Sequence, residues 1–96
     1  MQSQQQYNMG YKVSTNTQDI LTSTTIRPGK FGGWLAVNTG TGDAIVDGYT
    51  LAPGEGLDYT HIHPDVIWDM PITINLQAAG SKVRLTRLMY KEVARK

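Results

Sequence analysis

Cysteine is missing from this chain of 96 residues, which excludes disulfide bonds and thiolate zinc sites and leaves the redox compartment open. No apolar run approaches the roughly 18 residues that a membrane-spanning helix needs. The first residues, Met1 to Gln6, have neither the basic start nor the apolar stretch of a secretory signal peptide. We therefore expect a soluble protein that is made in the cytoplasm.

Basic residues are missing from the whole stretch between Phe31 and Ser81. The same stretch holds six of the eight acidic residues, namely Asp43, Asp47, Glu55, Asp58, Asp65 and Asp69. Six of the nine basic residues follow in the C-terminal segment, namely Lys82, Arg84, Arg87, Lys91, Arg95 and Lys96. A net charge of +1 thus combines an acidic middle with a basic C-terminal end, and this distribution favours contacts between copies or with a charged neighbour.

Short segments rich in β-branched or alternating residues fill most of the chain, separated by Gly and Pro. About six to eight short strands at about ten-residue spacing predict an all-β domain, a small antiparallel β-sandwich or barrel of jelly-roll or immunoglobulin-like type. Asp47-Gly48 predicts a two-residue type I′ hairpin. The expected strands lie within residues 20–26, 33–38, 44–46, 49–51, 57–63, 72–76 and 83–90, and residues 11–14 alternate weakly.

The last segment permits two interpretations. Val83, Arg87 and Tyr90 have helical spacing, but Val83 to Thr86 also alternates and can pair with Ile72 to Leu76 across a short connection. We favour a strand that ends near Tyr90. The expected organisation is a Gln-rich flexible tail over residues 1–6, a single β-sandwich domain over 7–90 and a basic C-terminal tail over 91–96.

The alternation also predicts the core. Trp34 and Trp68 stand in the most apolar runs and are expected to be buried. Most of the remaining core is expected from Val37, Ile45, Val46, Leu51, Ile72, Ile74, Leu76, Val83 and Leu85.

His61-Ile-His63 has the spacing of a metal-binding pair. Residues two apart on a strand point to the same side, so both imidazoles could contact one divalent cation, and Asp58 and Asp65 are close enough in sequence to add an oxygen ligand. Two histidines on the solvent face of an edge strand need no metal, however. We favour surface or interface histidines, with a metal site completed by other copies, or a catalytic centre, as the alternatives.

The stretch from Leu51 to Pro64 resembles part of the first motif of the cupins, metal-binding β-barrels that place a Pro-Gly-Glu turn before a His-x-His strand. Pro53-Gly54-Glu55 matches the turn, and the histidine pair matches the strand. The resemblance implies a metal-binding barrel as the alternative function.

This sequence departs from the cupin pattern in its ligands. The family's Glu ligand would fall at Ile67 or Trp68, and the second motif with its histidine is missing, because the chain has two histidines. The glycine that precedes the first histidine is also displaced by one residue in either direction, at Gly54 or Gly56. We therefore expect no metal and no cofactor.

Signatures of catalysis are missing as well. The chain has no Gly-x-Ser-x-Gly elbow, and no Lys follows the Gly-rich run Thr39 to Gly42. Asp65 and Asp69 could serve as acid and base, but acidic residues that border turns are common. Nucleic-acid binding is disfavoured because the aromatic residues are scattered and because Arg84 and Arg87 fall on opposite faces of a strand. The expectation is a protein that is not an enzyme.

The segment from Ala36 to Glu55 resembles small β-sandwich proteins of tailed bacteriophage particles. It contains an Asn-Thr-Gly-Thr-Gly turn from Asn38, an apolar strand, the Asp47-Gly48 hairpin, a second apolar strand and Pro-Gly-Glu. The final strand of the family corresponds here to Val83 to Tyr90. The resemblance implies a non-enzymatic, multi-copy virion protein, either a capsid decoration protein or a component of the head-tail junction or fibres.

For such a protein the expected partners are other virion proteins (capsid, portal or tail components) and further copies of the chain. We expect no membrane partner, and the expected location is the virion, after synthesis in the host cytoplasm. The charge distribution predicts that acidic residues of another chain meet Arg84, Arg87, Lys91, Arg95 and Lys96. The Gln-rich residues 1–6 are expected to become ordered against a neighbour.

Overall fold

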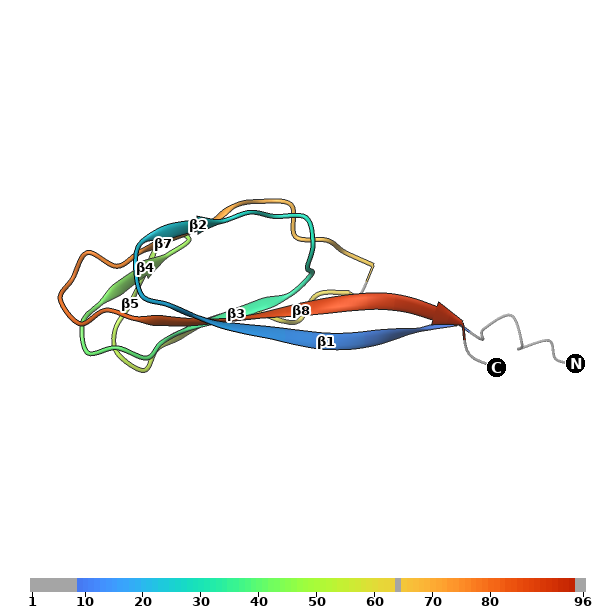
Figure 1. Cartoon of the computed structure of the whole chain (residues 1–96), viewed down its shortest axis with the longest axis horizontal. Helices are drawn as coiled ribbons and strands as arrows, with labels where there is room; N and C mark the ends of the chain where they lie inside the picture. The colour runs from blue at the N-terminus through green and yellow to red at the C-terminus, as the bar shows by residue number, and fades with distance from the viewer. Residues whose placement is uncertain (1–8, 64, 95–96) are drawn as a thin grey trace, which may run out of the picture.

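The computed structural model describes residues 9–63 and 65–94 of the chain. It confirms the all-β prediction: eight strands form two antiparallel four-stranded sheets, which face each other as the two layers of a small sandwich (Figure 1). One sheet has the strand order β1-β8-β3-β6 and the other β2-β7-β4-β5. The strands are β1 (Met9–Ile20), β2 (Thr24–Ile26), β3 (Trp34–Asn38), β4 (Ala44–Val46), β5 (Tyr49–Leu51), β6 (Gly56–Tyr59), β7 (Ile72–Asn75) and β8 (Val83–Ala94).

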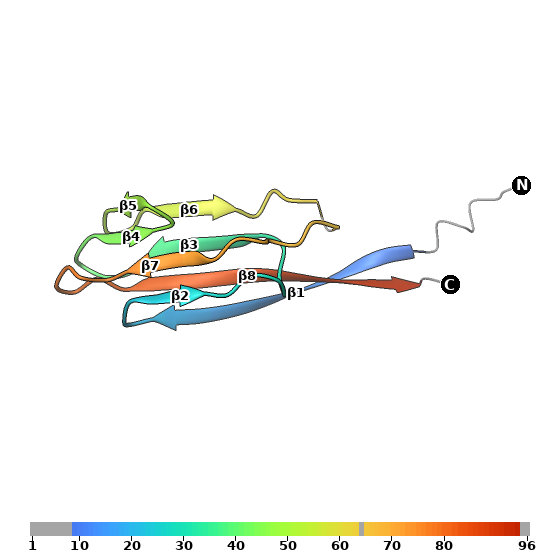
Figure 2. The same cartoon turned by 90° about the horizontal axis from the view of Figure 1, so that it is seen from above.

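The first and last strands form a long two-stranded ribbon. β1 and β8 have 12 residues each and pair along their full length, from Met9 opposite Ala94 to Ile20 opposite Val83. β3 pairs with the first part of β8, so the far part of the ribbon projects beyond the sandwich (Figures 1 and 2). This ribbon is the longest continuous element of the described chain.

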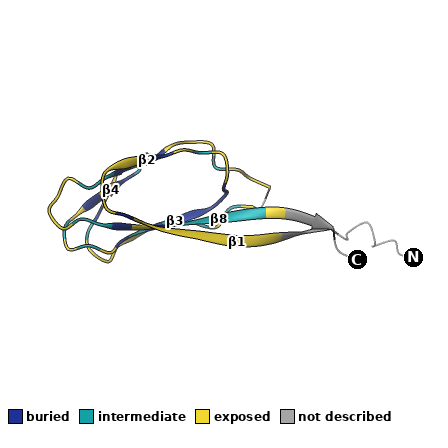
Figure 3. Ribbon diagram, in the orientation of Figure 1, coloured by how far each residue is buried: buried dark blue, intermediate teal, exposed yellow. Residues whose placement is uncertain are grey.

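The core lies between the sheets and follows the alternation of the strands (Figure 3). Val46, Leu51, Ile72, Ile74, Val83 and Leu85 are buried, as the sequence predicted, and so is Trp34. The remaining buried apolar residues are Ile20, Ile26, Phe31, Ala36 and Ala44.

Four residues of the expected core are placed differently. Ile45 is 40% exposed because its neighbours Ala44 and Val46 occupy the inner face of β4, and adjacent residues of a strand point to opposite faces. Val37 is half-buried on the outer side of β3 for the same reason. Leu76 is half-buried and packs against the edge of the core, as does Trp68.

Asn38 is the one buried polar residue among those described, and it joins two turns. Its side-chain amide donates to the carbonyls of Gly42 and Leu51, each over 2.8 Å, and its side-chain oxygen accepts from the Gly40 N–H over 2.9 Å. The Gly54 N–H donates to the backbone carbonyl of Asn38. The Asn-Thr-Gly turn and the Pro-Gly-Glu turn are therefore held together by the side chain and the backbone of a single residue.

The Gly-rich run after Asn38 packs closely on the connection between β7 and β8. A Cβ atom at Gly40 would lie 2.1 Å from the Gly80 carbonyl oxygen, and one at Gly42 would lie 2.2 Å from that of Ala79. Thr41 N–H donates to the same Gly80 carbonyl over 2.9 Å. Glycine is required at both positions because the two backbones are in contact.

The expected hairpin at Asp47-Gly48 is confirmed. β4 and β5 pair through it, and both turn residues have positive φ, 51° and 85°, as a type I′ turn demands. The expected pairing of Val83 to Thr86 with Ile72 to Leu76 is wrong. β7 and β8 belong to different sheets, and the connection between them crosses from one layer to the other.

The C-terminal strand is longer than expected. β8 continues to Ala94, four residues past Tyr90, because β1 supplies a partner along its whole length. Residues 91–94 are therefore part of the ribbon, where the sequence had predicted a basic tail. The predictions for residues 1–6 and for Arg95 and Lys96 lie outside the described residues.

Candidate functional site

The two histidines lie outside any strand. β6 ends at Tyr59, so His61 and His63 belong to the loop that leads to β7, and the premise that both share one face of a strand is wrong. The side chain of His61 is 92% exposed, and its Nε2 lies 4.0 Å from an Asp58 oxygen. Nδ1 of His63 lies 3.6 Å from an Asp65 oxygen and accepts a hydrogen bond from the Asp65 N–H.

These contacts tie each histidine to a separate carboxylate. Among the described side chains, no group of three or more His, Asp or Glu residues is placed to hold a metal ion. At the positions where the cupin pattern puts a Glu ligand, Ile67 is exposed to solvent and Trp68 packs on other aromatic rings. The loop is thus built from surface histidines and aromatic packing.

Trp68 anchors that loop to the end of the sandwich. Its ring packs edge-on against Trp34, with centroids 5.4 Å apart, and lies 5.0 Å from the ring of Tyr59. Its backbone N–H donates to the Phe31 carbonyl and its carbonyl accepts from Gly29, so the segment before β3 is fixed to the same loop. Burial raises the pKa of the Tyr59 phenol, which therefore stays neutral at physiological pH.

Asp58 is held by its own turn. The Thr60 side-chain hydroxyl and backbone N–H both donate to the same carboxylate oxygen. These hydrogen bonds, the hydroxyl's first, favour the ionised form and hold the pKa of Asp58 below its usual value. The carboxylate therefore serves the turn and makes only a long contact to His61.

The residues expected to bind a partner are divided between different surfaces. Arg84 lies on the outer face of the β1–β8–β3–β6 sheet, where its Nε donates to Asp19 on the neighbouring strand over 3.0 Å. Both side chains are about half exposed, so the pair is solvated. Arg84 therefore has an acidic partner within its own chain.

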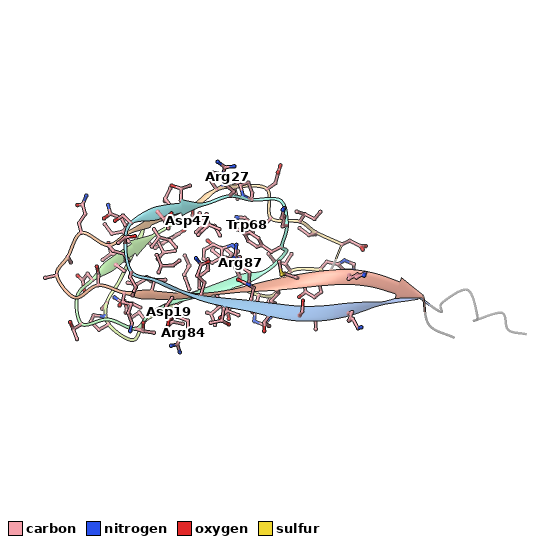
Figure 4. All side chains as sticks on the ribbon, viewed as in Figure 1. Asp19, Arg27, Asp47, Trp68, Arg84 and Arg87 are labelled. Carbon is pink, nitrogen blue, oxygen red and sulfur yellow. The ribbon has the colours of Figure 1, made fainter. Side chains whose placement is uncertain are left out.

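Arg87 points the other way, between the two layers (Figure 4). It is three residues from Arg84 on β8, so the predicted placement of the two arginines on opposite faces is confirmed. Its guanidinium lies over the Phe31 ring at 5.5 Å, and its Nη2 donates to the side-chain oxygens of Asn16 and Gln18 over 2.7 and 3.2 Å.

Lys91 is exposed on the projecting part of the ribbon, directly opposite Lys12 of β1. Like charges that face each other across a strand pair repel, so this position favours an acidic neighbour. Sequence reasoning missed Lys12, because β1 is rich in polar residues and its only alternation, over residues 11–14, is weak. Its evenly spread Thr, Ser and Val residues were the available signal for a strand.

The acidic residues do not form one patch. Asp43 and Asp47 flank β4, whereas Asp65 and Asp69 lie in the loop after β6, which is at the end of the sandwich nearer the ribbon (Figure 2). The predicted contact between an acidic and a basic region would therefore have to involve acidic residues on several different surfaces.

The outer edge of β1 is the largest unpaired backbone surface in the described part of the chain. β1 is the first strand of its sheet, so its second edge has no strand beside it. All its described side chains except Ile20 are exposed (Figure 3), and Val13 is 55% exposed. Such an edge offers N–H and C=O groups for pairing with another strand.

An apolar loop lies beside the base of the ribbon. Val66, Ile67 and Met70 are exposed on the connection between β6 and β7. The first two line a small hollow of about 110 Å³ together with Lys30 and Tyr90. The hollow is too small for most organic ligands, but the exposed apolar side chains suit a protein contact.

No protein-family model, curated protein or solved structure matches this chain. Among the residues that the structure describes, no helix is long and apolar enough to cross a membrane.

Proposed function

We propose that this chain is a non-enzymatic structural protein of a tailed-bacteriophage particle, present in many copies as a capsid decoration protein or a head-tail component. It acts through protein–protein contacts with other virion proteins and with its own copies. The observation that carries the proposal is the projecting β1–β8 ribbon with the unpaired outer edge of β1.

The ribbon suits assembly for a physical reason. An exposed edge strand pairs readily with a strand of another chain, and natural monomeric proteins protect such edges with charges, proline, bulges or short length. β1 has 12 residues, no proline and two charged residues, Lys12 and Asp19. Asp19 is already paired with Arg84, which leaves Lys12 as the one charge on β1 without an ion pair among the described side chains.

The neighbouring apolar loop adds side-chain contacts to this backbone surface. Val66, Ile67 and Met70 are exposed at the base of the ribbon, so a strand added along β1 and a surface resting on this loop could belong to one partner or to two. The resemblance of residues 36–55 to virion β-sandwich proteins supplies the biological setting of the proposal.

The location is tested on particles. Virions from a host that carries the gene are purified by density gradient, and their proteins are quantified by mass spectrometry. We expect this chain to co-purify with the particles at several copies each. Its presence in the cleared lysate but not in the particle band would contradict the proposal.

The role of the edge is tested with two neighbouring proline variants. The N–H groups of successive strand residues point to opposite edges, so of Ser14→Pro and Thr15→Pro one removes a bond to β8 and the other removes a donor from the free edge. We expect the edge variant to keep nearly its wild-type melting temperature and to lose incorporation into particles. Normal incorporation of both folded variants would contradict edge pairing.

A further inference from the structure

A pocket of about 460 Å³ opens beside Arg87, within the size range of small-molecule sites. β1, β2, β8 and the segment after β2 contribute to its lining. Three of its residues are basic, namely Arg27, Lys30 and Arg87, and none is acidic. The pocket is therefore positive, although the chain as a whole is nearly neutral.

Arg87 is held in place by groups that leave its charge uncompensated. Asn16 and Gln18 accept from its Nη2, and Phe31 lies against its face, but all three are neutral. Among the described side chains, no carboxylate lies within ion-pair distance of Arg87, Arg27 or Lys30. A half-buried guanidinium without an anion is an unusual arrangement, because buried charges are normally paired.

The surroundings of Arg87 also contain donors without acceptors. Its Nε is buried and has no hydrogen-bond partner, and the same is true of Nε1 in Trp34 and Trp68. Trp34 stands directly opposite Arg87 in the register of β3 and β8, and its ring contacts Trp68. Figure 4 shows Trp68 and Arg87 in the same space between the layers. The two oxygens that accept from Arg87 are both neutral, and three buried donors of this region have no acceptor.

The rest of the pocket wall is mixed, with two polar residues, Gln18 and Thr25, and three apolar ones. Ile26, Pro28 and Phe31 line it together with the basic residues. A carboxylate on an organic stem matches this combination, because the planar acid group pairs with the guanidinium fork and the stem contacts the apolar wall. Phosphate would place three charged oxygens where part of the wall offers no hydrogen bonds.

We propose that this pocket is a carboxylate-binding site in which Arg87 binds the acid group and Arg27 and Lys30 attract it. The carboxylate can belong to a small organic acid or to an acidic side chain of a partner protein. The second source rests on the proposed assembly function, whereas the first does not.

Binding is tested by NMR on the ¹⁵N-labelled chain, through the Arg Nε–H and Trp indole N–H signals. The probes are N-acetylglutamate, its diamide N-acetylglutamine amide, which has no carboxylate, and inorganic phosphate. We expect saturable shifts of the Arg87 signal with N-acetylglutamate alone, and smaller shifts of the Trp signals, because Trp34 and Trp68 do not line the pocket. Equal shifts with the uncharged diamide, or tighter binding of phosphate, would overturn the carboxylate assignment.

Arg87→Gln is the decisive variant, and Arg84→Gln is its matched control on the other face of the same strand. Loss of a charge-assisted pair should weaken N-acetylglutamate about tenfold or more in Arg87→Gln, and the control should stay within about twofold. If Arg87→Gln does not fold, the double variant Arg27→Gln/Lys30→Gln serves instead, because both side chains are exposed. Unchanged affinity in the folded variants would overturn the proposal.

A capped peptide Ala-Glu-Ala and its Ala-Gln-Ala counterpart distinguish the two sources. The acidic peptide and N-acetylglutamate both carry the side-chain carboxylate, so their affinities are compared. Tighter binding of the acidic peptide assigns the site to a partner's side chain, tighter binding of N-acetylglutamate assigns it to a small acid, and binding of neither overturns the site. These results are independent of particle incorporation, which the proline variants of β1 test on another part of the ribbon.

Discussion

The side-chain amide of Asn38 donates a hydrogen bond to the backbone carbonyl of Leu51 over 2.8 Å, inside the protein. This bond connects the end of β3 to the end of β5, two strands that belong to different sheets. The two turns that carry the sequence resemblance therefore meet in space through one residue.

Replacing Asn38 with Ala should destabilise the fold by about 3 kcal/mol, because buried groups of Gly40, Gly42 and Leu51 lose their partner. Chemical denaturation measures the free energy of unfolding. Asn75→Ala is the control, since that side chain accepts one exposed hydrogen bond, from Gln77. Equal losses in the two variants would show that Asn38 does not hold the turns.

Ile74→Ala should cost about 2–5 kcal/mol, because a buried isoleucine is replaced by a cavity. Ile45→Ala on the neighbouring strand should cost about 1 kcal/mol or less, since Ile45 lies on the outer face. The same denaturation experiment compares both variants. A larger loss for Ile45 would reverse the assignment of the two faces of the sheet.

Gly40→Ala should destabilise the protein by about 3 kcal/mol, because the new methyl group collides with the backbone at Gly80 and Lys82. Gly48→Ala provides the comparison: its φ is positive, but the space around it is open, so the expected cost is about 1 kcal/mol. Thermal melting followed by circular dichroism ranks the two. A milder effect at Gly40 would mean that the loops separate easily.

Thr60→Ala should raise the pKa of Asp58 toward its usual value, measured by NMR titration of the carboxyl carbon. Because the pKa of Asp58 is lower in the folded than in the unfolded protein, its ionised form stabilises the fold. The contribution of Asp58 is present above the unfolded-state pKa and is lost as the pH falls through the folded-state pKa. Thr50→Ala, an exposed threonine on β5, is the control and should leave the Asp58 titration unchanged.

His61→Ala/His63→Ala should leave the fold and its melting temperature unchanged, since both side chains are exposed in a loop. Elemental analysis of the purified wild-type protein should find no stoichiometric transition metal. A bound ion that disappears in the double variant would favour the cupin-like alternative.

Local features of this fold were predictable from the sequence where a residue type strongly favours one backbone conformation. Asp47-Gly48 predicted the type I′ hairpin because both positions need positive φ. The buried halves of β7 and β8 followed from alternation, which identified Ile72, Ile74, Val83 and Leu85. Such signals lie within a few residues of one another.

The errors concern relationships between distant segments. Sequence order suggested that β7 and β8 pair, yet packing of the 78–82 connection on Gly40 and Gly42 carries the chain into the other layer. The length of β1 was underestimated because both its faces are polar. The length of β8 was underestimated too, because β1 is its pairing partner. The sequence could not predict which way the Arg87 side chain points, because that depends on which face of β8 packs against the core.

The pairing of Met9 with Ala94 places both ends of the described chain at the tip of one ribbon (Figure 1). A pulling force applied through these two ends would therefore load the hydrogen bonds of β1 and β8 one pair at a time, as in opening a zipper. The sandwich would carry little tension until the ribbon had opened. If both ends are tethered in an assembly, the ribbon acts as a compliant mechanical element that protects the core from strain.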